Sequence, residues 1–129
     1  MIGKVIKSLL VANADHLVLV PESSIFPYVI NENTTLPAII YTIDSSVPDY
    51  TKDGWAGDAM TFSVVSLSDN YNTLQSIVPE IRTALELERG TIEGILIERI
   101  YMSGMAEGFN LTENVFMNRL SFTVEMKGY

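Results

Sequence analysis

The sequence contains no cysteine and a single histidine, His16, among its 129 residues. The absence of thiols excludes disulfides, zinc–thiolate sites, iron–sulfur clusters and thiol nucleophiles. A Ser-His-Asp triad would have to use His16, and no serine lies in the Gly-x-Ser-x-Gly pattern that exposes such a nucleophile. We interpret the adjacent Asp15 and His16 as the end of a helix, where the helix dipole favours a histidine, rather than as a catalytic pair.

Basic residues are also scarce, because 8 Lys and Arg residues stand against 16 Asp and Glu residues, giving a net charge of −8 at pH 7. Such a protein lacks the positive surface that neutralises DNA phosphates or adheres to an anionic membrane. The apolar run Leu17–Val20 is far shorter than the roughly 20 residues that span a bilayer. The run Ser8–Ala12 is likewise too short for a signal peptide. We therefore expect the protein neither to associate with membranes nor to bind DNA.

Motifs of nucleotide and metal chemistry are missing as well. The sequence has no Gly-x-Gly-x-x-Gly and no P-loop. An EF-hand count that begins at Asp49 places Asp53 and Gly54 suitably, but its twelfth position is Met60, where calcium requires a bidentate glutamate. Acid–base catalysis needs two carboxylates on opposite sides of a pocket, and nothing in the sequence places a pair in this way. The sequence therefore predicts no enzyme, no catalytic residue, no metal and no cofactor.

The residues that are present suit a compact core, since 47% are hydrophobic and only 19% are charged. A chain of this length is typical of one domain, and we expect residues 1–129 to form a single one. Apolar residues from Ile2 to Leu10 recur at helical spacing and predict a helix over about 2–13. A second stripe from Leu74 to Leu85 predicts a helix capped by Asp69 or Asn70, with a kink or break at Pro79.

Period-2 alternation predicts strands, most clearly over residues 115–127. Further strands are expected over 17–20, 25–30, 36–43, 59–68 and 91–103. Pro27 makes the second of these an edge or irregular strand, and Gly94 suggests a bulge in the last. The segment 104–114 is interpreted as a loop. The order of elements indicates an α+β fold, an antiparallel sheet of four or five strands with two helices packed on one face.

The stretch from Asp44 to Asp58 is the longest polar one, and we interpret it as a long loop between two antiparallel strands. Long loops in compact domains are often functional. Large aromatics in such a loop either fold back onto their own sheet or face a partner, and the sequence leaves both readings open. The candidate assembly surface in this stretch consists of Asp49, Tyr50, Asp53, Trp55 and Asp58.

Several segments in a fixed order carry a resemblance to a known family. They are Leu36–Tyr41, Thr61–Val64, Asp69–Asn72 leading to Ile81–Leu85, and Asn114–Val124. This order resembles the tail-completion (head–tail joining) proteins of long-tailed bacteriophages and prophages, which are similar in fold to tail terminators. The resemblance covers about residues 2–127. Pro79, the long Asp44–Asp58 segment and the weak strand over 25–30 depart from the family pattern.

The resemblance implies a non-enzymatic virion protein. Such proteins form a ring, usually of six copies, at the head-proximal end of the tail tube, where they stop tube growth and join tail to head. The implied partners are further copies of the chain, tail-tube proteins and head-completion proteins, and DNA passes through without specific binding. The implied location is the virion tail, and the host cytoplasm before assembly. A negative lumen would let DNA slide, which suits the charge of −8.

A second hypothesis belongs to another functional class. An α+β domain of this size could also be a small intracellular ligand-binding domain or an enzyme subunit without a recognisable motif. A buried pocket with converging polar groups would favour that alternative. Sheet edges that are completed only by a neighbouring molecule would favour the ring.

Overall fold

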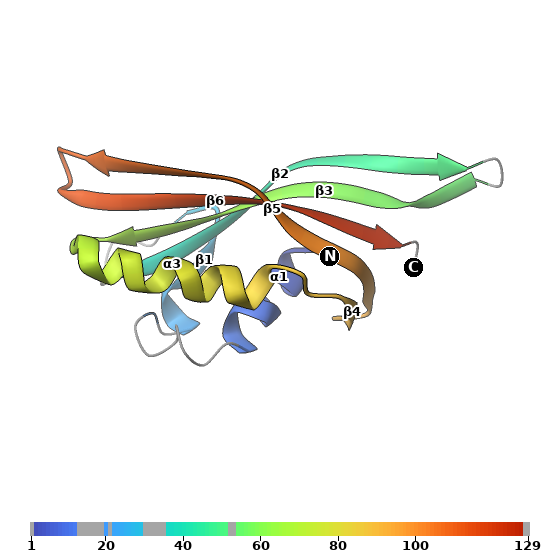
Figure 1. Cartoon of the computed structure of the whole chain (residues 1–129), viewed down its shortest axis with the longest axis horizontal. Helices are drawn as coiled ribbons and strands as arrows, with labels where there is room; N and C mark the ends of the chain where they lie inside the picture. Colours follow the sequence, from blue (N-terminus) through green and yellow to red (C-terminus); the bar gives the residue numbers. More distant parts are fainter. Residues whose placement is uncertain (1, 13–19, 21, 30–35, 52–53, 128–129) are drawn as a thin grey trace.

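The computed structural model (Figure 1) describes residues 2–12, 20, 22–29, 36–51 and 54–127. Its elements are the helix α1 (Ile2–Ala12), the short 3-10 turn η1 (Glu22–Ser24), β1 (Ile25–Pro27), β2 (Ala38–Thr51), β3 (Gly54–Ser68), the helix α3 (Tyr71–Leu85), β4 (Gly90–Ile92), β5 (Ile95–Asn110) and β6 (Val115–Lys127). Both helices cover the same face of the sheet (Figure 1). The α+β class and the placement of the two helices are therefore as the sequence indicated.

The sheet has six strands in the order β1-β2-β3-β6-β5-β4. The expected four or five antiparallel strands are wrong in two respects. The edge strand β1 runs parallel to β2, which makes the sheet mixed. A separate strand β4 also precedes β5, because Glu93 (φ 51) and Gly94 (φ 77) form a two-residue turn where a bulge was expected. Positive φ at both central residues is the signature of a tight hairpin turn.

The core lies between the central strands and the helices. Phe62 of β3 and Phe122 of β6 are direct cross-strand partners, and their rings stack with centroids 5.4 Å apart. Both side chains are fully buried. The helix side chains that pack into the same core are Val5, Ile6, Leu10, Ile77, Ile81 and Leu85. The two helical stripes of the sequence are therefore the buried faces of α1 and α3.

The helix α3 is continuous from Tyr71 to Leu85, so of the two alternatives expected at Pro79, a kink or a break, the break is wrong. Pro79 lies on the exposed face, whereas Ile77 and Ile81 on either side of it are buried. Packing on both sides of the proline holds the helix together although the proline removes one backbone donor. At the start of α3 the side chain of Asn70 accepts hydrogen bonds from the backbone N–H groups of Asn72 and Thr73, as a cap should.

Most of both predicted long loops is strand, and of the segment 104–114 only 111–114 is a turn. β2 and β3 continue through the Asp44–Asp58 stretch to Thr51 and Gly54, and β5 continues to Asn110. The two hairpins end at opposite ends of the molecule: the β2–β3 hairpin extends well beyond the helices, whereas the β5–β6 hairpin ends near the start of α3 (Figure 1). Strands that leave the core need no apolar face, so their polar composition reflects exposure rather than a loop.

The remaining expectations concern the first third of the chain. The strand expected over 25–30 is the edge strand β1, as Pro27 predicted, and it is shorter than expected because it ends at Pro27. Asp15, His16 and residues 17–19 of the predicted strand 17–20 lie outside the described residues. Val20, at the end of that segment, is buried in the core.

Candidate assembly surfaces

The β2–β3 arm, defined as residues 44–51 and 54–58, contains four of the five predicted assembly residues. Tyr50 and Trp55 are backbone partners at its end, Asp49 pairs with Gly57, and Asp58 lies opposite Pro48. Asp53 lies outside the described residues. The structure therefore brings Tyr50 and Trp55 together, and it places them on a paired hairpin.

The β5–β6 tip, defined as residues 105–117, is the second projecting hairpin, and sequence reasoning missed it. Its exposed apolar side chains include Met105 (59% exposed), Phe109 (44%) and Leu111 (84%), together with Met117. Exposed apolar groups that gather in one region mark interaction surfaces. The signal that could have found it was the pair of large apolar residues Met105 and Phe109 inside a segment that we interpreted as a loop.

The turn end of this hairpin is attached to the start of α3. The rings of Phe109 and Phe116 lie 4.7 Å apart, and those of Phe116 and Tyr71 lie 5.3 Å apart. The hydroxyl of Tyr71 donates to the Glu107 carboxylate at 3.0 Å, and the amide of Gln75 donates to it at 3.2 Å. The hydrogen bond to Glu107 raises the pKa of Tyr71. These contacts fix the direction in which the tip projects.

The two outer edges of the sheet are largely bare. β1 covers β2 only at Ile39–Tyr41, and β4 covers β5 only at Ile95–Ile97. In the part of the chain that the structure describes, no strand pairs with the outer edge of β2 over 42–51 or of β5 over 98–110, although the backbone N–H of Leu87 donates to the carbonyl of Ile100 on the β5 edge. Unpaired strand edges present backbone donors and acceptors that can template pairing with another chain.

The sheet face opposite the helices carries paired charges. The hydroxyl of Ser63 donates to the Asp44 carboxylate, which also accepts from Arg119 at 3.2 Å. Arg99 donates two hydrogen bonds to Glu125, at 2.9 and 3.1 Å, and these raise the pKa of Arg99. Arg119 and Arg99 are therefore each held by a carboxylate on this face.

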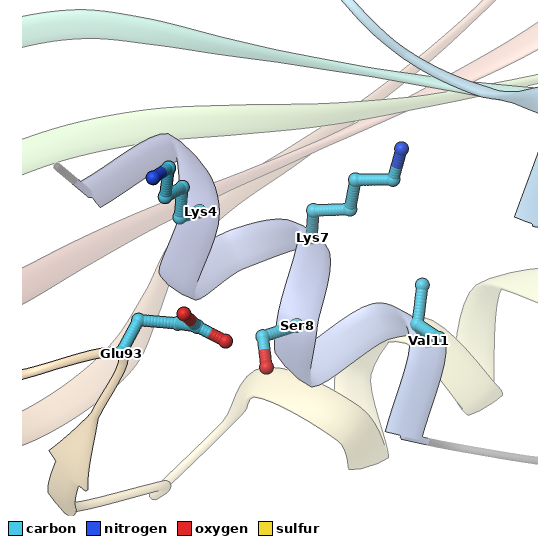
Figure 2. A pocket seen from close by; sticks show the side chains of 5 residues that line it. All are labelled: Lys4, Lys7, Ser8, Val11 and Glu93. Carbon is cyan, nitrogen blue, oxygen red and sulfur yellow. The ribbon is translucent and has the colours of Figure 1, made fainter.

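The hollows near the helices are surface grooves. Figure 2 shows one of about 240 Å³ along α1, lined by Lys4, Lys7, Ser8, Val11 and Glu93. None of these five side chains is buried. Within the described ranges, no group of three or more Asp, Glu or His side chains could hold a metal ion. No helix of the described residues is long and apolar enough to cross a membrane. The groove along α1 is therefore an open surface feature and not a buried pocket with converging polar groups.

Comparisons with known proteins show which of them share this fold. No protein-family model matches the sequence, and no curated protein matches it. Among solved structures, the chain is similar to one chain of the virion of a native gene transfer agent particle, with a TM-score of 0.76. The match covers 96% of this chain and 92% of that one, at 11% sequence identity. The chain therefore shares its fold, over nearly its whole length, with a component of a virion particle.

Proposed function

We propose that the protein is a non-enzymatic structural component of a phage or prophage tail. It forms a ring at the head-proximal end of the tail tube, ends tube growth and joins the tail to the head. Copies of the chain would form the ring, six in number as in the family it resembles, and the tube and head-completion proteins would dock on its two sides. The protein is located in the host cytoplasm before assembly and in the virion tail afterwards.

The observation that carries this proposal is the pair of bare edges on opposite sides of one sheet. Two different, complementary surfaces on one molecule generate head-to-tail contacts, which close into a ring when the rotation allows. The fold shared with a gene transfer agent virion component supports the same conclusion. The β2–β3 arm with Tyr50 and Trp55 remains the proposed contact to tube or neighbour.

The sheet face opposite the helices, called the open face below, supports the proposed passage of DNA. Since Arg99 and Arg119 are engaged by Glu125 and Asp44, this face offers few free cations to hold phosphates. A face of this kind lining a ring would let the genome slide through without binding it.

Deletion of the gene from the phage or prophage tests the proposal. Electron microscopy should show filled heads separated from tails, and tail tubes of irregular length. Complementation with the wild-type chain should restore joined virions. Normal virions from the deletion strain would overturn the proposal.

A further inference from the structure

The core changes character along the sheet face that the helices cover. On this face Val64 of β3 pairs with Leu120 of β6, and both belong to the hydrophobic core. The next cross-strand row on the same face is polar and consists of Ser66, Asn118 and Glu107, on β3, β6 and β5. The hydrophobic core residues of these three strands all lie on one side of this row, which is called the polar row below.

A separate aromatic cluster lies on the other side of the polar row. It joins Tyr71 at the start of α3 to Phe116 and Phe109 of the β5–β6 tip. The start of α3 and the turn end of the hairpin lie at the same end of the molecule (Figure 1). A small cluster that is separated from the main core can open while that core stays packed.

The polar row contains two buried atoms that lack a partner. Among the described residues, neither the hydroxyl oxygen of Ser66 nor the side-chain carbonyl oxygen of Asn118 has a hydrogen-bond partner. Both residues are only 1% exposed. A buried polar atom without a partner raises the free energy of the closed structure, and contact with water removes that cost. Opening is therefore easier at the polar row than at the apolar pair Val64 and Leu120.

One carboxylate connects the two sides of this weak point. Glu107 accepts hydrogen bonds from the Tyr71 hydroxyl at 3.0 Å and from the Gln75 amide at 3.2 Å, both on α3. The side-chain amide of Asn118 on β6 lies 3.5 Å from the same carboxylate. Hydrogen bonds to an ionised acceptor are stronger than those between neutral groups. Glu107 therefore ties α3 to both strands of the hairpin.

We propose that the β5–β6 tip is a hinged segment that opens from the start of α3 at the polar row, and that Glu107 is the latch that keeps it closed. Opening separates the ring of Tyr71 from that of Phe116 and brings Ser66 into contact with water. The core stays folded, so the tip can change its direction without global unfolding. This device is a property of the single chain and does not depend on the proposed ring.

Thiol labelling measures the opening, because the chain has no cysteine of its own. Ser66→Cys places a thiol in the polar row, and the matched control Val64→Cys places one in the core, on the same face of β3. In the purified full-length protein, an aromatic disulfide reagent should label the Ser66→Cys variant about tenfold faster or more. Equal labelling rates would overturn the proposal. Asn118→Cys and Leu120→Cys on β6 replace this pair if either β3 variant fails to fold.

Removal of the carboxylate tests the latch. Glu107→Ala should raise the labelling rate of the Ser66→Cys variant by about tenfold or more, as loss of hydrogen bonds to a charged acceptor predicts. The rate for Val64→Cys should not change. Glu113→Ala is the control, because Glu113 is an exposed acidic residue of the same tip and its backbone N–H, bonded to Asn110, is kept in the variant.

The possible results separate a latch from a merely stabilising residue. Faster labelling at both thiol positions would mean that Glu107→Ala weakens the whole fold, and it would overturn the latch. The same acceleration with Glu113→Ala would also overturn it, since the loss of any negative charge would then suffice. These measurements use the isolated chain, so their failure leaves the proposed function standing, and the gene deletion tests that function separately.

Discussion

Tyr50 and Trp55 lie opposite each other at the end of the β2–β3 hairpin, as backbone partners in its register. The sequence placed both in a loop, where a fold-back onto the sheet was as plausible as exposure to a partner. Pairing on a hairpin that projects past the helices favours the second reading (Figure 1). An aromatic pair at the end of a projecting arm is well placed to anchor a partner.

Trp55→Ala should therefore leave the fold nearly unchanged and reduce ring formation or docking on tail tubes. Thermal melting and an assembly assay on the same variant test this, with Phe62→Ala as the control. Phe62 is buried in the core, and its truncation should cost about 3–5 kcal/mol. A loss of that size for Trp55→Ala would make Trp55 a core residue and move the assembly surface elsewhere.

Elements that pack against the core could be predicted from the sequence. The stripe that includes Leu74, Ile77 and Ile81 is the buried face of α3, and Asn70 caps that helix. The alternation around Phe122 is the buried face of β6. In each case one face of the element is buried, so the side-chain pattern records the period of the backbone.

The projecting hairpins could not be predicted in the same way. Residues 44–47 of β2 are exposed and residues 105–110 of β5 are mostly exposed, so hydrophobicity no longer alternates there. The register also shifts near Asp44 and at Met102/Gly104, which disturbs the period further. For this reason the sequence predicted only one of the two candidate surfaces. Tyr50 and Trp55 stood out by residue type, but the exposed Phe109 and Leu111 did not.

Specific DNA binding should be absent. The net charge of −8 and the paired arginines on the open face leave little to neutralise phosphates. A gel shift with double-stranded DNA in ~150 mM salt should show no complex at micromolar protein. A complex of micromolar affinity or tighter would contradict the prediction and reveal a basic patch that the overall charge conceals.

The ion pair between Arg82 and Glu86 at the end of α3 should give a small, pH-dependent contribution to stability. The hydrogen bond from Arg82 lowers the pKa of the Glu86 carboxyl, with the positive charge of Arg82 as a further cause. A lowered pKa in the folded state means that the contribution is present above the unfolded pKa of about 4.3 and is lost as the pH falls through the folded pKa.

Glu86→Gln should therefore lower the free energy of unfolding by about 0.3–0.5 kcal/mol at pH 7, as expected for an exposed helix pair. The difference from wild type should vanish near pH 2, where both chains lack the charge. Urea denaturation at the two pH values measures it. A difference that grows as the pH falls would contradict the assigned sign.

Ser63 and Ser66 provide a matched pair on β3, since both are buried but only one hydroxyl has a partner. Ser63 donates to Asp44, which Arg119 also contacts. The hydroxyl oxygen of Ser66 has no hydrogen-bond partner among the described residues. Removing a satisfied hydroxyl from a charged acceptor costs about 1.5–3 kcal/mol, whereas removing an unsatisfied one relieves the cost of burying it.

Ser63→Ala should therefore destabilise the protein by about 1.5–3 kcal/mol, and Ser66→Ala should be neutral or slightly stabilising. The two variants remove the same atom from the same strand, so differences in helix or strand propensity cancel. Chemical denaturation of both against wild type provides the measurement. If Ser66→Ala proves as costly as Ser63→Ala, the Ser66 hydroxyl has a partner in solution, and a buried water between Ser66 and its cross-strand neighbour Asn118 would be the first to look for.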